Sequence, residues 1–422
     1  MALPAHRITD NEEIVPPSMP FVTMNKRVLL VNKFYYTRGG AEVVAINLYD
    51  LLTQNGYDVA VFTMDYPDTI QAPNVFTTPE VSFKTPSTKD KINFARRTLG
   101  GYRVVEDFKR VLKEFKPAVV HLHNIHSYIS PVVGQIARDN GCRVVWTLHD
   151  YKLICPAYSC LNRGNVCERC FINKARILSQ RCFKESFAAS SLAFLEAMKW
   201  NRRRLEKFTH AFICPSIFMR EQMIKGGFNA HKLHVVNNFI DPVKLRELKA
   251  LPHNTKDEYY TYIGRLSSEK GLDTLLKAAR NLPYKLKIAG GGPLKQRLIS
   301  DYQSSNIEFL GRLTAEEISR LLSRARLLVQ PSEWYENNPL STIEALCAGV
   351  PVVGAQIGGI PELINPFNGL TFTWGDQIEL ERCIKSVMSL NYPFNYDDIA
   401  REAQARFSGE SHLEKLEKIY FE

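Results

Sequence analysis

The chain has 422 residues, of which 45% are hydrophobic and 23% charged, a composition typical of folded globular proteins. This length is too great for one hydrophobic core and predicts two domains of roughly 200 residues each. The formal net charge of +10 favours anionic partners, and no apolar run reaches the ~18–20 residues of a membrane-spanning helix.

Residues 1–25 are polar and proline-rich and contain acidic residues, so they lack the features of a signal peptide. We expect this segment to be a loose leader and the protein to be cytoplasmic.

From residue 27 onward, short β-branched runs alternate with amphipathic helical stretches. Near-continuous apolar strands separated by helices indicate a parallel sheet covered on both faces. Two series of predicted strands are separated by the polar stretch 251–258: 28–32, 58–64, 118–123, 143–149 and 210–216, then 259–266, 285–292, 307–313, 326–332 and 350–356.

These series predict an α/β fold with two doubly wound Rossmann-like domains facing across a cleft. The expected bounds are 26–240 for the N-terminal domain, with a cysteine-rich insert near 155–182, and 241–395 for the C-terminal domain. Residues 396–422 are expected to form terminal helices that cross back to the first domain.

The first loop of the N-terminal domain is RGGAE (38–42), between a strand and a helix. Farther along, basic residues mix with aromatic and aliphatic ones at helical spacing in 91–116 and 199–207. Two interpretations of these stretches stay open: two solvated helix faces, or a surface that rests on anionic lipid.

Histidines follow two neighbouring predicted strands. His121, His123 and His126 lie in HLHNIHS, and His149 precedes Asp150 at the end of the next strand. Their spacing is compatible with a metal, but no acidic partner accompanies the first three, which favours a structural or acceptor-side role for His123.

Five of the nine cysteines lie between 155 and 182, and they include a Cys-x2-Cys pair. This spacing is typical of zinc sites, and we expect a structural tetrathiolate site. Packed free thiols and disulfides are the alternatives. The expected ligands are Cys155, Cys167, Cys170 and Cys182, with Cys160 as a spare that could replace one of them.

Glycine-rich loops follow the strands of the C-terminal domain. GRLSSEKG (264–271) carries Arg265 and Lys270, which can converge on an anion near a helix start, and AGGGPL (289–294) permits close approach to a ligand. The latter is not G-x-G-x-x-G, so a dinucleotide fingerprint is not supported.

The stretch PSEWYENNPLSTIEALCAG (331–349) predicts a helix over about 339–348, with Asn338 as N-cap and Pro339 at the first helical position. Glu336 then precedes the helix, and Glu344 lies on its second turn. Two carboxylates beside free backbone N–H groups are suited to binding sugar hydroxyls.

Together, GRLSSEKG, GGGPL, FLGRL, the 331–354 stretch and GGIPEL resemble the donor-binding domain of family 4 glycosyltransferases, which have the GT-B fold. The resemblance covers residues ~27–410, and its E-x7-E element is Glu336 and Glu344. Many members have Gly-Phe-Gly after the first glutamate, where this chain has Asn-Asn-Pro, which leaves the donor sugar open.

The resemblance implies specific roles. Arg265 and Lys270 would bind the donor diphosphate, Glu344 the ribose, and Glu336 and His149 the transferred sugar. The implied catalytic residues are thus Glu336, His149, Arg265 and Lys270. The other implied donor-binding residues are Gly39, Gly40, Gly264, Gly291, Asn337, Asn338, Pro339 and Leu340, and the acceptor-side residues are Glu42, His123 and Asp150.

The implied reaction moves a sugar from a UDP-, GDP- or ADP-linked donor to a saccharide or lipid-linked saccharide, with retention and without a catalytic cofactor. Bacterial capsule, exopolysaccharide or lipopolysaccharide assembly would suit it, with peripheral contact at the inner face of the membrane. A nucleotide-sugar epimerase and a silent nucleotide-sugar-binding subunit are the alternatives. No nucleic-acid recognition motif is present.

Overall fold

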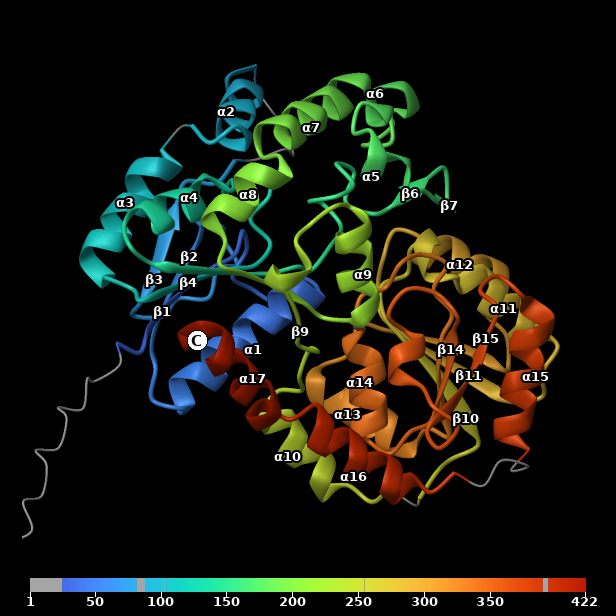
Figure 1. Cartoon of the computed structure of the whole chain (residues 1–422). Helices are drawn as coiled ribbons and strands as arrows, with labels where there is room; N and C mark the ends of the chain where they lie inside the picture. The colour runs from blue at the N-terminus through green and yellow to red at the C-terminus, as the bar shows by residue number, and fades with distance from the viewer. Residues whose placement is uncertain (1–24, 82–87, 102, 254, 390–393) are drawn as a thin grey trace, which may run out of the picture.

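The computed structural model describes residues 25–81, 88–101, 103–253, 255–389 and 394–422 (Figure 1). In this part of the chain, two parallel sheets with helices on both faces form two Rossmann-like domains, as the sequence predicts. No helix among the described residues is long and apolar enough to cross a membrane.

The N-terminal sheet has seven parallel strands in the order β3-β2-β1-β4-β5-β8-β9. Its inner strands are buried on both faces because their residues are apolar almost without interruption. The strands are β1 (Arg27–Val31), β2 (Asp58–Met64), β3 (Val75–Thr78), β4 (Val119–Leu122), β5 (Arg143–Thr147), β8 (Ala211–Cys214) and β9 (Leu233–Val235).

Helices cover both faces of this sheet, and a short antiparallel hairpin, β6 (Leu161–Asn162) with β7 (Asn165–Val166), lies within the cysteine-rich segment. The helices are α1 (Gly40–Gln54), α2 (Thr88–Thr98), α3 (Val104–Phe115), α4 (Val132–Asp139), α5 (Arg169–Ile172), α6 (Arg176–Gln180), α7 (Phe187–Lys199), α8 (Arg202–Phe208) and α9 (Ile217–Lys225).

The C-terminal sheet has six parallel strands in the order β12-β11-β10-β13-β14-β15. The strand order reverses between β10 and β13, and such a switch point opens a crevice at the carboxyl edge of the sheet. The strands are β10 (Tyr259–Ile263), β11 (Lys285–Ala289), β12 (Ile307–Gly311), β13 (Leu327–Gln330), β14 (Val352–Ala355) and β15 (Gly369–Phe372).

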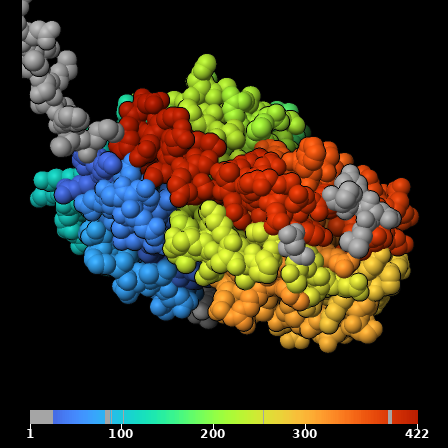
Figure 2. All heavy atoms as spheres, turned by 90° about the horizontal axis from the view of Figure 1, so that it is seen from below, coloured from blue at the N-terminus to red at the C-terminus, as the bar shows by residue number. Residues whose placement is uncertain are grey.

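The last helix returns to the N-terminal domain. Leu413, Leu416 and Tyr420 of α17 pack in one buried cluster with Val28 and Leu30 of β1. Figure 2 shows the red C-terminal segment running across the molecule from the orange half to the blue N-terminal residues. The helices of this half are α10 (Pro242–Ala250), α11 (Leu272–Arg280), α12 (Lys295–Tyr302), α13 (Ala315–Arg324), α14 (Leu340–Cys347), α15 (Gln377–Met388), α16 (Tyr396–Arg406) and α17 (Gly409–Phe421).

The predicted strands all occur: β2 has the predicted bounds, β1 is shifted by one residue, and the others are shorter than predicted. The sequence patterns did not reveal β3, β9 and β15, which have three or four residues each and lie at or beside the sheet edges. Strands this short show little periodicity, so their pairing partners rather than their own residues define them.

Candidate active site

A cleft of about 530 Å³ lies between the two domains, where the carboxyl ends of both sheets meet. From the N-terminal domain it is lined by the start of α1 and by residues following β5. From the C-terminal domain it is lined by the loops after β10 and β13 and by the first turns of α14. The predicted residues in this lining are Gly39, Gly40, His149, Asp150, Gly264, Lys270, Glu336, Asn337, Asn338, Pro339, Leu340 and Glu344.

Lys270 and Glu336 form a tight ion pair in the cleft. The Lys270 Nζ lies 2.6 Å from Glu336 Oε1, which also accepts a hydrogen bond of 2.7 Å from the Ser332 hydroxyl. Burial raises the pKa of Glu336, but the charge of Lys270 and these hydrogen bonds outweigh it, so the pKa lies below its usual value. Glu336 is therefore ionised at neutral pH.

Lys270 is placed by a short turn after β10. Gly271, the next residue, has φ +64, and a Cβ there would lie 1.9 Å from the carbonyl oxygen of Pro331. The turn of Lys270 thus packs directly on the loop that carries Glu336, which brings two residues 66 positions apart in sequence into contact.

The start of α14 differs from the prediction. The helix spans Leu340–Cys347, and Pro339 is its N-cap rather than its first residue. The Asn338 side chain does not cap it, because its Oδ1 accepts a hydrogen bond of 2.8 Å from the Asn238 backbone N–H. Asn238 belongs to the segment between the domains, so Asn338 serves the domain junction instead of the helix.

Glu344 faces a partner that the sequence did not reveal. Its Oε1 lies 2.6 Å from Lys244 Nζ, on α10, and both side chains are largely buried, at 17% and 12% exposure. Glu344 still lines the cleft, so its carboxylate can exchange part of this pairing for a ligand hydroxyl.

Residues at the end of the N-terminal sheet supply histidine and acid groups. His149 lines the cleft, and its Nε2 lies 3.0 Å from Nδ1 of His123, which is buried beneath it. Burial and the nearby charge of Lys33 lower the pKa of His149 to about 4, so the ring is neutral at physiological pH.

Lys33 is the second residue after β1 and was missed by the sequence patterns. Burial lowers its pKa, although the nearby carboxylates of Asp150 and Glu42 favour its charge. Burial likewise raises the pKa of Asp150. The position of Lys33 near the carboxyl end of a parallel strand is the signal that could have identified this residue.

The glycine loops allow backbones to approach closely. A Cβ on Gly290, which has φ +144, would lie 1.9 Å from the Gly264 carbonyl oxygen. A Cβ on Gly359 would lie 1.8 Å from the carbonyl oxygen of Asn337. GGIPEL therefore supports the Glu336 loop from behind.

Some predicted residues lie away from the lining. Arg265 is exposed, and Gly291 lies against the Arg312 side chain. Glu42 and His123 are buried behind the cleft wall. Of the described residues, Lys270 is therefore the cation of GRLSSEKG that the structure brings to the site.

The domains meet through polar contacts around the cleft. Both Glu362 carboxylate oxygens accept hydrogen bonds, of 2.8 and 2.6 Å, from the backbone N–H groups of Ile217 and Phe218 at the start of α9. The Tyr335 hydroxyl donates to Glu168 Oε1 at 2.9 Å, and its ring packs edge-on against Phe218. The Cys-rich segment thereby touches the C-terminal domain beside the site.

All nine cysteines are free thiols. The Cys155 thiol interacts with those of Cys160 and Cys170, and these hydrogen bonds hold its pKa well below the ordinary value despite burial. Within the described residues, no group of three or more His, Cys, Asp or Glu is arranged to hold a metal ion. Zinc at this cluster stays a prediction, and the expected spare, Cys160, has its thiol beside that of Cys155.

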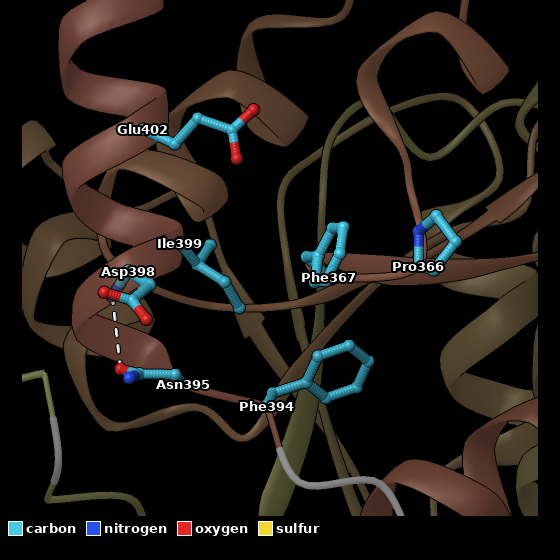
Figure 3. Close-up of a pocket in the computed structure, with 7 residues that line it drawn as sticks. All are labelled: Pro366, Phe367, Phe394, Asn395, Asp398, Ile399 and Glu402. Carbon is cyan, nitrogen blue, oxygen red and sulfur yellow. Dashed lines mark hydrogen bonds between the residues drawn. The ribbon is translucent and has the colours of Figure 1, made fainter.

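A second hollow, of about 360 Å³, lies at the start of α16 (Figure 3). Phe367, Pro366 and Phe394 form one side of it, and the carboxylates of Asp398 and Glu402 lie on the other. It has no predicted site residue and is separate from the cleft.

Two family models match consecutive parts of the chain. The model described as Glycosyltransferase Family 4 matches residues 38–244, and the one described as Glycosyl transferases group 1 matches residues 243–406. Together they span both domains.

Among curated proteins, an uncharacterized 42.6 kDa protein in the cps region of Klebsiella pneumoniae is 26% identical over 415 residues, which are 93% of this chain and 99% of that protein. Among solved structures, sucrose-phosphate synthase from Thermosynechococcus elongatus has a TM-score of 0.67 at 19% identity, covering 93% of this chain and 98% of that chain. Anabaena Alr3699/HepE in complex with UDP-glucose has a TM-score of 0.63 at 18% identity, covering 93% of this chain and 99% of that chain.

Proposed function

The chain belongs to glycosyltransferase family 4 and has the GT-B fold, and from this premise we propose that it transfers a sugar from a nucleotide-sugar donor to a saccharide or lipid-linked saccharide acceptor. The observation that carries the proposal is the Lys270–Glu336 pair in the interdomain cleft, which is also lined by Glu344, on the second turn of α14, and by His149 from the N-terminal domain. UDP-, GDP- and ADP-linked sugars are the donor classes.

The donor would lie with its diphosphate toward Lys270 and the loop glycines. Lys270 is the cation nearest to the Glu336 carboxylate, and the start of α14 adds free backbone N–H groups. Arg265 is exposed at the rim and would reach the diphosphate by a change of side-chain rotamer. Glu344 would accept hydrogen bonds from the ribose hydroxyls, and Glu336 from the sugar hydroxyls.

The proposed reaction retains anomeric configuration. The bond between the anomeric carbon and the diphosphate oxygen breaks, and the acceptor oxygen bonds to the same face of that carbon. The departing phosphate oxygen takes the acceptor's proton. Lys270 and the helix start would stabilise the growing negative charge without a requirement for a metal. Glu336, paired with Lys270, positions the sugar.

The proposed process is bacterial surface polysaccharide assembly, namely capsule, exopolysaccharide or lipopolysaccharide. Its support is the relative in the cps region, whose whole length this chain matches. The protein would act in the cytoplasm, at the inner face of the membrane.

The membrane surface would differ from the one expected from sequence. The apolar residues of α3 and α8, such as Phe108 and Leu205, are buried, so these helices present solvated basic faces. Ile92 of α2 is exposed, but three exposed apolar side chains gather on α7, namely Phe187, Leu195 and Met198. We propose this face, with the exposed Lys199 beside it, as the membrane contact.

The function is tested with the purified chain and a panel of UDP-, GDP- and ADP-sugars. We expect one donor to raise the melting temperature and to release its nucleoside diphosphate, slowly to water and faster with an acceptor. Lys270→Ala should lower that release at least tenfold, while Lys285→Ala, on a surface pair outside the cleft, should leave it unchanged.

The alternatives give other results. Stabilisation without release indicates a silent binding subunit, and an epimerised nucleotide sugar without release indicates an epimerase. If no donor stabilises the protein or is consumed, the transferase proposal is wrong.

A further inference from the structure

Behind the cleft wall lies a row of three neighbouring imidazole rings. The rings of His121 and His123 are nearly parallel with centroids 4.4 Å apart, and those of His123 and His149 are nearly parallel with centroids 5.3 Å apart. Both ring nitrogens of His121 have partners, the Tyr420 hydroxyl at 2.6 Å and the Thr147 hydroxyl at 2.7 Å. Of the three rings, His149 lines the cleft.

His123 is held rigidly at the end of β4. Its exposure is 1%, its backbone N–H donates to the Val31 carbonyl at 2.9 Å, and its carbonyl accepts from the Trp146 indole at 2.9 Å. The side chain therefore has a fixed position relative to His149. The contact between the rings joins His123 Nδ1 to His149 Nε2 at 3.0 Å.

One of these two nitrogens carries the hydrogen. Burial lowers the pKa of both rings, so both are neutral and each holds one N–H. The other nitrogen of His123, Nε2, is buried and has no hydrogen-bond partner among the described residues.

The unpartnered Nε2 of His123 decides whether His123 or His149 donates the hydrogen bond between them. If His149 donated, His123 would carry its hydrogen on Nε2, and that N–H would be buried and unsatisfied. If His123 donates from Nδ1, the unpartnered Nε2 bears only a lone pair. In folded proteins, buried N–H groups without an acceptor are rarer than buried acceptor atoms without a donor. The arrangement in which His123 donates is therefore favoured.

We propose that His123 is a positioning residue, whose Nδ1–H donates to His149 Nε2 and thereby fixes the His149 hydrogen on Nδ1. His149 then presents a hydrogen-bond donor, and not an acceptor, to the ligand in the cleft. The inference rests on the proposed function only where it names that ligand as the sugar of a nucleotide-sugar donor. A sugar hydroxyl or ring oxygen would accept this hydrogen bond.

The tautomer can be measured directly. Long-range proton–nitrogen spectra of the full chain with labelled histidine report which nitrogen carries the hydrogen, and loss of a signal in His149→Gln assigns that residue. We expect Nδ1–H for His149 in the unmodified protein. Nε2–H there overturns the proposal.

Two variants separate positioning from packing. His123→Leu removes the donor, and His149 should then shift to Nε2–H, the form that a neutral histidine side chain prefers in water. His123→Asn keeps an amide nitrogen at the same number of bonds from the backbone, so His149 should stay Nδ1–H. An unchanged tautomer in His123→Leu contradicts the role, and the other histidines serve as internal references.

Binding supplies the second readout, with UDP and UDP-glucose as probes. His123→Leu should weaken UDP-glucose roughly tenfold and leave UDP unchanged, while His123→Asn should bind both as the unmodified protein does. An equal loss for both probes would indicate a packing role and contradict the proposal. If UDP-glucose binds no form of the protein, the proposed donor class fails while the tautomer result still decides the role of His123.

Discussion

At the level of single residues, the two glutamates of the E-x7-E element have different surroundings. Glu336 precedes α14, is 7% exposed and pairs with Lys270 from the loop after β10. Glu344 lies within α14 and pairs with Lys244 from α10. The same residue type thus meets two different cations, which gives each carboxylate a separate position along the cleft.

We therefore expect the two substitutions to act differently. Glu344→Ala should weaken UDP binding roughly tenfold, since a carboxylate hydrogen bond to the ribose would be lost. Glu336→Gln should lower kcat by a larger factor and change nucleotide affinity little, since its Ser332 and Lys270 partners position the sugar end. Calorimetry and turnover with the accepted donor measure both.

A matched control is Asp257→Ala, which breaks a surface ion pair with Arg324 in the same domain, outside the cleft lining. Asp257→Ala should change neither the affinity for UDP nor kcat. Equal and small effects of Glu336→Gln and Glu344→Ala would contradict the proposed binding roles of both glutamates.

At the level of elements, the conformation of the loop between β10 and α11 depends on the left-handed backbone of Gly271. The left-handed φ of +64 costs a residue with a Cβ about 1–2 kcal/mol, and the Pro331 carbonyl leaves no space for that Cβ. The turn that places Lys270 thus depends on glycine at this position.

Gly271→Ala should lower the free energy of unfolding by about 1–3 kcal/mol more than Gly141→Ala does. Gly141 has a similar φ of +81, but a Cβ there meets nothing within 4 Å, so the pair isolates the contact with Pro331. Denaturant unfolding measures both. Gly271→Ala should also weaken donor binding; equal stability losses for the two variants would mean that the loop relaxes freely.

The cysteine-rich element joins the two domains beside the cleft. Val166 of β7 packs against the core of the C-terminal domain, and Glu168 accepts the Tyr335 hydroxyl. In Figure 1 the hairpin and α5 lie at the edge of the N-terminal domain that faces the C-terminal one. The state of the thiols therefore affects a segment that contacts both halves.

The spacing of these cysteines predicts near-stoichiometric zinc in the purified protein, measured by elemental analysis. Because Cys160 lies beside Cys155, we expect Cys160→Ser to lower the zinc content, whereas Cys383→Ser in α15 should not. Protein without zinc, with all its thiols open to alkylation, would favour packed free cysteines instead.

At the level of the whole molecule, the two domains are closed on each other through contacts spread along the cleft. Glu362 binds the start of α9, Asn338 binds Asn238, and α17 packs on the N-terminal sheet. Widening the cleft would therefore break these polar contacts, while the packing of α17 would keep the domains attached.

The α7 face gives a prediction for the whole molecule at a lipid surface. The unmodified protein should co-sediment with vesicles that contain phosphatidylglycerol at low salt, and a Phe187→Ser, Leu195→Ser variant should bind several-fold less. Phe367→Ser, at a similarly exposed position of the C-terminal domain, is the control. Equal binding to neutral vesicles, or none to anionic ones, would contradict the proposed membrane face.

Sequence patterns were sufficient for ten of the thirteen strands described in the two sheets, because buried parallel strands are apolar on both faces and therefore stand out as short apolar runs. They also placed most of the cleft residues, since loops after parallel strands gather at one edge. The N-cap of α14 was predicted wrongly, because the Asn338 side chain accepts a hydrogen bond from the backbone N–H of Asn238, 100 residues away, instead of from the start of the helix.

Only the tertiary structure decided which charges meet. Lys244 pairs with Glu344, which is 100 residues away in sequence. Likewise, the charge of Lys33, which lies after β1, is favoured by the carboxylates of Glu42 on α1 and of Asp150 after β5. The contact of His123 with His149 likewise depends on the pairing of β4 with β5. Local sequence fixes where strands and loops lie, but ion pairs and tautomers depend on distances between segments that only packing brings together.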